Sequence, residues 1–149
     1  MSQKNLILDH HTRIVQWQQE PETYFEGHNQ ANVFYEFDLV PAESRQQASV
    51  AFTVVSILEV LNQYKGVIVN AKTQTVFTLK NQGHKPTVDT LFHCAQVASQ
   101  AFFSILQAET AGHLLAGITL KKPDKEEIER NLSHSLQVQY GTEGYVEIL

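Results

Sequence analysis

A histidine and the only cysteine of the chain are adjacent, at His93 and Cys94, and a thiol beside an imidazole is the pair that cysteine nucleophiles use. Neighbouring residues on a helix point about 100° apart, so these two side chains do not face each other. A reactive thiol also needs nearby positive charge that lowers its pKa, and the residues around Cys94 supply none. We therefore interpret Cys94 as a packed free thiol, and we predict no catalytic residue.

A second candidate lies near the start of the sequence, where Asp9, His10 and His11 match the three-residue signature of a family of metal-dependent phosphoesterases. That chemistry needs further acidic and histidine clusters, which hold two metal ions around an activated water molecule. The sequence contains no such clusters, and its seven histidines show no helical HxxxH spacing. We interpret these three residues as structural or surface sequence, and we predict no metal site and no cofactor.

The composition of the chain excludes several functional classes. Its 149 residues suit one domain, and its net charge of -5 argues against nucleic acid, because phosphate binding requires clustered Lys and Arg. No apolar run approaches the roughly 18 residues that cross a bilayer, so we predict no membrane insertion. A single cysteine precludes an internal disulfide and favours a reducing, cytoplasmic location. Glycine-rich phosphate loops and the GxSxG motif are also absent from the sequence.

Three elements can be predicted from local pattern. Residues 33–40 alternate apolar and polar side chains, as a half-buried strand does. Apolar residues recur on one helical face over about 87–109, with Thr87 at the N-cap and Asp89 in the first turn, where the helix dipole favours an acid. A final helix over about 124–136 is predicted by an acid at its N-cap position with a glutamate three residues later.

The stretch 50–79, VAFTVVSILEVLNQYKGVIVNAKTQTVFTL, has two interpretations. Its polar residues recur about every 3.6 positions up to Gln63, which favours a helix ending near Gly66. Its many β-branched residues favour instead two long strands that turn at NQYKG. Local pattern leaves both interpretations open, and they lead to different folds.

The order of elements and three segments resemble the SecB family of protein-export chaperones. The longest segment is 97–128, VASQAFFSILQAETAGHLLAGITLKKPDKEEI, in which a helix ends in a small-residue and glycine turn before an apolar stretch, a proline and a capped helix. Residues 76–79 (VFTL) are similar to the strand end that closes the long hairpin of the family, and residues 25–39 are similar to its early strands.

This resemblance implies one α+β domain over residues 1–149. It implies an antiparallel sheet with a long central hairpin at about 49–80, and helices at about 87–109 and 124–136 packed on one face. It also implies an ATP-independent holdase, assembled as a dimer or tetramer, that binds unfolded polypeptides and partners a translocase motor or an antitoxin. An apolar client groove would be lined by Phe77, Phe92, Phe102, Phe103, Leu115, Ile118 and Leu120.

Two alternatives remain at the level of the sequence. If residues 50–61 are helical, the order of elements from Val33 becomes β-α-β-β-α-β, a ferredoxin-like fold with an extra C-terminal helix. Such a fold would indicate a small regulatory or ligand-binding module. The other alternative is an enzyme that uses the histidines, with or without a metal ion.

Overall fold

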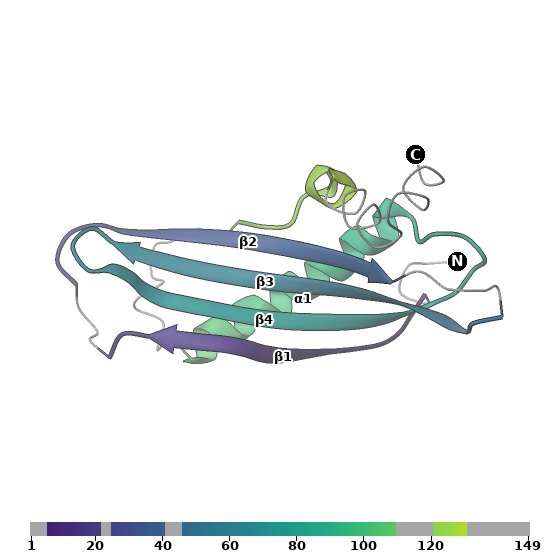
Figure 1. The fold of residues 1–149 in the computed structure, drawn as a ribbon, viewed down its shortest axis with the longest axis horizontal. Coiled ribbons are helices and arrows are strands. Elements are labelled where there is room, and N and C mark those ends of the chain that lie inside the picture. Colours follow the sequence, from purple (N-terminus) through teal and green to yellow (C-terminus); the bar gives the residue numbers. More distant parts are fainter. Residues whose placement is uncertain (1–5, 22–24, 41–45, 110–120, 131–149) are drawn as a thin grey trace, which may run out of the picture.

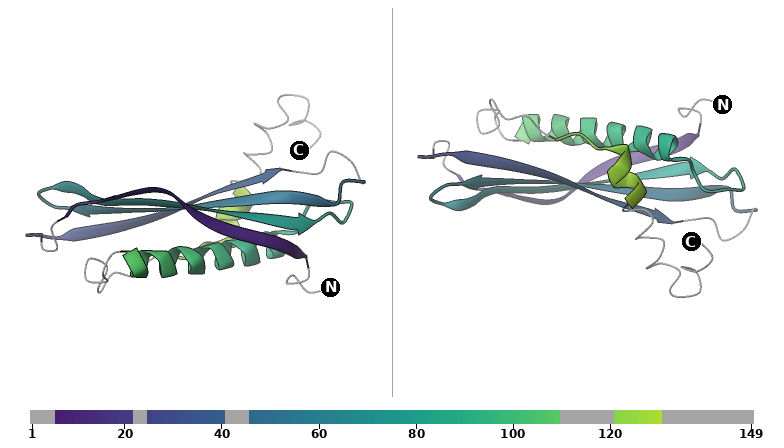
Figure 2. Two further views of the ribbon diagram at one scale, coloured as in Figure 1. Left: turned by 90° about the horizontal axis from the view of Figure 1, so that it is seen from below. Right: turned by 90° about the horizontal axis from the view of Figure 1, so that it is seen from above.

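The structure is a computed structural model that describes residues 6–21, 25–40, 46–109 and 121–130. Four antiparallel strands form one sheet in the order β1-β4-β3-β2, and a long helix crosses one of its faces (Figures 1 and 2). The elements are β1 (Ile7–Gln19), β2 (Asn29–Val40), β3 (Ser49–Asn62), β4 (Gly66–Lys80) and α1 (Val88–Glu109). Residues 125–130, at the end of the last described range, are also helical. The α+β antiparallel architecture predicted above is confirmed.

Residues 50–61 lie within strand β3 and are not helical, so the ferredoxin-like alternative is wrong. Residues of β3 alternate between buried and half-buried along the whole strand, because successive side chains point to opposite faces of the sheet. The face away from α1 is half-buried because β2 and β4 flank the strand on both sides. The polar residues that suggested a helix belong to both faces of the sheet: Ser56 faces α1, whereas Thr53 and Glu59 lie on the opposite face. Their helical spacing is therefore a coincidence. The strand is buried on the face towards α1 and half-buried on the other face, so polar residues need not follow a strict alternation.

The turn between β3 and β4 is built by Asn62, which is almost fully buried. Its Oδ1 accepts hydrogen bonds from the backbone N–H groups of Tyr64 and Lys65, both at 3.0 Å. Gly66 completes the turn with a φ of 79°, a backbone conformation that side chains disfavour. The predicted NQYKG turn is thereby confirmed at residue level.

The two outer strands of the sheet differ in regularity. The pairing of β1 with β4 shifts register twice, between Ile7 and Asp9 and again between Ile14 and Gln16. The pairing of β2 with β3 runs without a shift from Asn29 to Val40. The bulged strand β1 is bent, whereas β2 presents a regular edge.

The core lies between the sheet and α1, where Phe52, Phe77 and Phe102 are among the largest fully enclosed side chains. The predicted N-cap of α1 is present, because the Thr87 Oγ1 accepts the backbone N–H of Thr90 at 3.3 Å. Ile128, within the helical residues 125–130, joins the same core. The remainder of the predicted final helix, 131–136, lies outside the described residues. None of the described helices is both long and apolar enough to cross a membrane.

Candidate functional site

The outer edge of β2 is the most regular open feature of the sheet. Its twelve residues pair with β3 on one side, and no strand lies on the other side within the described parts of the chain. The backbone N–H and C=O groups along the outer side of an edge strand can template another extended chain. The edge therefore has the geometry of a peptide-binding site.

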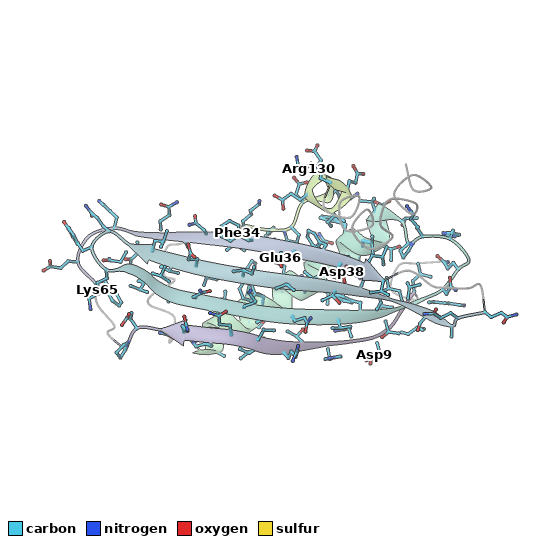
Figure 3. All side chains as sticks on the ribbon, viewed as in Figure 1. Asp9, Phe34, Glu36, Asp38, Lys65 and Arg130 are labelled. Carbon is cyan, nitrogen blue, oxygen red and sulfur yellow. The ribbon has the colours of Figure 1, made fainter. Side chains whose placement is uncertain are left out.

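The side chains of β2 divide between the two faces of the sheet. Phe34, Glu36 and Asp38 are exposed and point to the face opposite α1 (Figure 3). Phe34 is 51% exposed and Val40 is 45% exposed, although both are large apolar residues. Phe34 lies beside Ile57 of β3 in the register, so the two side chains form an apolar spot at the edge of the sheet. The strand thus combines a regular outer edge with exposed apolar contact area.

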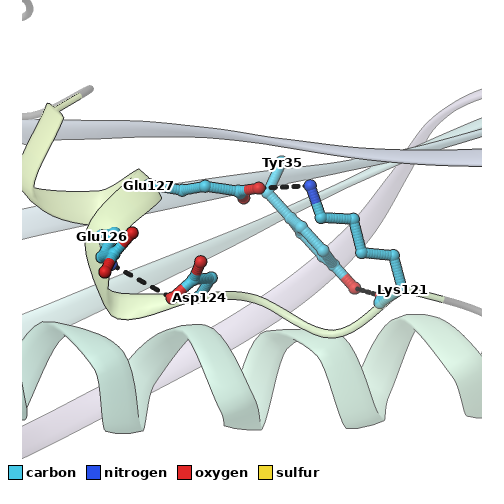
Figure 4. Close-up of polar contacts among 5 residues, drawn as sticks. All are labelled: Tyr35, Lys121, Asp124, Glu126 and Glu127. Atoms are coloured by element: carbon cyan, nitrogen blue, oxygen red, sulfur yellow. Dashed lines mark hydrogen bonds and ion pairs between the residues drawn. The ribbon is translucent and has the colours of Figure 1, made fainter.

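Residues 121–130, which we name the strap, lie beside this edge (Figure 1). The Tyr35 hydroxyl, on the α1 side of β2, donates a hydrogen bond to the backbone carbonyl of Lys121 at 2.7 Å (Figure 4). The same hydroxyl lies 3.2 Å from the Ser99 Oγ of α1. One tyrosine therefore connects strand, helix and strap.

The protonation of Tyr35 suits this role. Burial raises the pKa of the hydroxyl above its ordinary value, an effect that the Ser99 hydrogen bond partly offsets and that the charge of Glu127 reinforces. A tyrosine with the ordinary pKa of 10.0 is already protonated at neutral pH, and the raised pKa keeps the hydroxyl a donor to the Lys121 carbonyl at more alkaline pH as well.

Several further contacts hold the strap. Pro123 is buried, and Ile128 is 0% exposed and belongs to the core cluster. The Lys125 Nζ lies 2.8 Å from the Asp89 Oδ1 and 5.3 Å from the centre of the Phe92 ring, both in the first turns of α1. Because the Lys125–Asp89 pair is exposed to solvent, its net contribution to docking is small.

The predicted capping pair of the final helix is present in part. The Asp124 Oδ1 accepts the backbone N–H of Glu126 at 3.2 Å, as an N-cap residue does (Figure 4). The side chain of Glu127 pairs with Lys121 instead of returning to the cap. This ion pair closes the strap on itself.

The groove residues predicted from the sequence occupy different environments. Phe77 and Phe102 are fully enclosed between the sheet and α1. Phe92 and Phe103 are partly buried against the core, and the structure brings Phe92 next to the strap. Leu115, Ile118 and Leu120 lie outside the described residues. The groove itself stays a prediction.

The sequence did not identify Phe34, Tyr35 and Val40 of β2 as candidate site residues. Alternation over 33–40 assigns Tyr35 to the buried face, and the same alternation leaves Phe34 and Val40 on the polar face. The sequence did carry one signal of an exposed apolar surface here, namely two apolar residues on a strand face that is otherwise charged. The connection from Tyr35 to Lys121 spans 86 positions and has no local signature.

The chemical candidates found in the sequence do not form a site. Cys94 is buried, and burial raises the pKa of its thiol to about 12, so it is not a poised nucleophile. Asp9, His10 and His11 are exposed on β1, where the His10 ring stacks on Phe77 with the ring centres 5.5 Å apart. Among the described residues, no group of three His, Cys, Asp or Glu side chains could hold a metal ion.

Comparison with known proteins bears on the fold. No protein-family model and no curated protein matches the sequence. Among solved structures, the chain is similar to the Mycobacterium tuberculosis SecB-like chaperone Rv1957, in complex with a ChAD peptide from the HigA1 antitoxin Rv1956. The TM-score is 0.50 at 14% sequence identity, and the match covers 78% of this chain and 89% of that one. The chain therefore has a SecB-like fold.

Proposed function

We propose that this protein is an ATP-independent holdase chaperone that binds unfolded polypeptides as an added strand along β2. The SecB-like fold is the premise, and one observation carries the proposal. The regular β2 edge has no strand partner on its outer side among the described residues, and it displays Phe34 and Val40 to solvent.

Strand addition explains how such a protein would accept many sequences. Backbone hydrogen bonds are available from any extended chain, whereas side-chain pockets select among chains. Exposed apolar residues beside the edge add affinity for segments that are buried in folded proteins but exposed in unfolded ones. A net charge of -5 would keep a protein with this surface soluble.

The proposed partners are unfolded polypeptide clients. The antitoxin peptide bound to Rv1957 supports an antitoxin segment as one class of client, and a translocase motor is the alternative partner. Assembly into a dimer or tetramer is part of the proposal, because several edges acting on one chain would increase avidity. Phe92 and Phe103 are proposed as apolar lining on the α1 face, next to the enclosed core that includes Phe77 and Phe102, with Leu115, Ile118 and Leu120 proposed to complete the groove.

The proposal is tested by suppression of aggregation of a chemically unfolded protein without ATP. We expect the wild-type chain to suppress aggregation, and Phe34→Ser or Val40→Ser to need about tenfold more protein for the same effect, since each removes apolar contact area at the edge. Val67→Ser is the matched control, because Val67 of β4 is 46% exposed against 45% for Val40. Equal activity of all three variants would exclude β2 as the client site.

A further inference from the structure

We propose that the strap, residues 121–130, is a displaceable cover of the β2 edge, latched by the Tyr35 hydroxyl and removed when a client strand binds. This inference rests on the proposed function and adds to it a closed state of the same site. The latch can be tested without a client, so the two proposals can fail separately.

The position of the strap carries the first step. Seen from above the β2 edge, the strap runs across β2 between the level of α1 and the level of the sheet (Figure 2). Seen face-on, it lies alongside the outer side of the same strand (Figure 1). A polypeptide that added along β2 at Tyr35 would need the space that the strap occupies.

The second step concerns how the strap is held. Docking uses the buried side chains of Pro123 and Ile128, and one backbone carbonyl held by Tyr35. An apolar client residue can replace Ile128 against the core, and a client backbone can replace the strap beside β2. The strap therefore competes with a client for the same surface.

The latch is open to a direct protease test. Trypsin cleaves the bond between Lys121 and Lys122, and the carbonyl of that bond is the group that the Tyr35 hydroxyl holds. Tyr35→Phe keeps the buried ring and removes the bond, so we expect cleavage after Lys121 to accelerate about fivefold, the population change typical of one hydrogen bond. Cleavage after Lys72, in the centre of β4, reports unfolding of the sheet and should change much less.

Three further variants sharpen this test. Tyr64→Phe is the matched control, because Tyr64 is 71% exposed at the hairpin, and it should leave cleavage after Lys121 unchanged. Ser99→Ala removes the contact with α1 but not the bond to the strap, so it should have little effect. Ile128→Ala weakens docking independently of Tyr35 and should accelerate cleavage, which keeps the test decisive if Tyr35→Phe folds poorly. Parallel acceleration after Lys121 and Lys72 in both Tyr35→Phe and Ile128→Ala would overturn the latch.

The link to the client is tested with an unfolded synthetic peptide that contains no lysine or arginine, so that trypsin cannot cleave it. A saturating concentration should accelerate cleavage after Lys121 in the wild-type chain, and the peptide should bind Tyr35→Phe several-fold more tightly. Peptide binding that leaves this cleavage unchanged would overturn the cover while the chaperone proposal survives. Absence of binding to every variant, with faster cleavage in Tyr35→Phe, would overturn the chaperone proposal and leave the latch as a structural device.

Discussion

At the scale of single residues, two buried hydroxyls mark the interface between sheet and helix. Ser56 of β3 and Thr73 of β4 are paired in the register and fully enclosed. Neither side-chain oxygen has a hydrogen-bond partner within the described chain. Thr75, two positions along β4, is equally enclosed, but its Oγ1 lies 2.8 Å from the Thr12 Oγ1. Comparing Thr73 with Thr75 therefore isolates the free-energy cost of burying a hydroxyl without a hydrogen-bond partner.

Thr73→Val should therefore raise the free energy of unfolding by about 1 kcal/mol, because it replaces an unpaired buried hydroxyl with a methyl group of similar shape. Thr75→Val should lower the same quantity by about 1 kcal/mol, since it leaves the Thr12 hydroxyl without its partner. Both values come from urea denaturation. Changes of the same sign in the two variants would show that the hydrogen bond does not distinguish these positions.

Cys94 gives a prediction about pH. Because the pKa of its thiol is raised from 9.0 to about 12, the unfolded chain loses this proton at a lower pH than the folded chain does. Its contribution to stability is complete below pH 9 and is lost as the pH rises towards 12. Over this window the wild-type chain should lose more unfolding free energy than Cys94→Ala, by at most about 1.4 kcal/mol per pH unit. Equal slopes in alkaline denaturation would contradict the buried thiol.

At the scale of elements, the loop before β2 is fixed to the β3–β4 hairpin. The Asn62 Nδ2 donates hydrogen bonds to the Glu26 carbonyl at 2.9 Å and to the Asn29 Oδ1 at 2.8 Å. Gly27 has a φ of 84°, and a Cβ atom there would come within 2.7 Å of the Tyr64 ring. The start of β2 is thus positioned by close contact with the neighbouring turn.

Gly27→Ala should destabilise the protein by about 2 kcal/mol, which combines the left-handed backbone with a steric clash. Gly83→Ala is the control, because Gly83 has a φ of 83° with open space around it and should cost only about 1 kcal/mol. Thermal unfolding of both variants gives the difference. Equal costs would mean that the Tyr64 ring moves aside freely.

The elements also show where sequence reasoning succeeds and stops. The strand at 33–40 and the helix at 87–109 were predictable from periodicity, because each buries one face against a single core. Residues 50–61 were not, because the outer face of this central strand is half-buried and also carries apolar residues such as Val55 and Ile57, which hides the alternation in the sequence. The family resemblance supplied what local pattern could not. The Tyr35–Lys121 contact was unpredictable because it depends on how distant segments fold together.

At the scale of the whole molecule, the sheet has two unlike edges. Strand β1 carries two register shifts and is bent, and such bulges blunt an edge against further pairing. Strand β2 is regular over its full length and has the strap beside it. The β1 edge is thus protected against further strand pairing, whereas the β2 edge is the one that we propose to bind clients. The oligomeric state stays a prediction.

The unbroken register of β2 has a statistical consequence for the proposed function. A strand edge without a bulge does not specify one pairing register. An incoming chain can therefore pair with it in any of several registers that differ by two residues. A long unfolded chain offers many such registers, whereas a short peptide offers few. The number of equivalent registers itself lowers the free energy of binding, and the edge would therefore rank its clients by length before it ranks them by sequence.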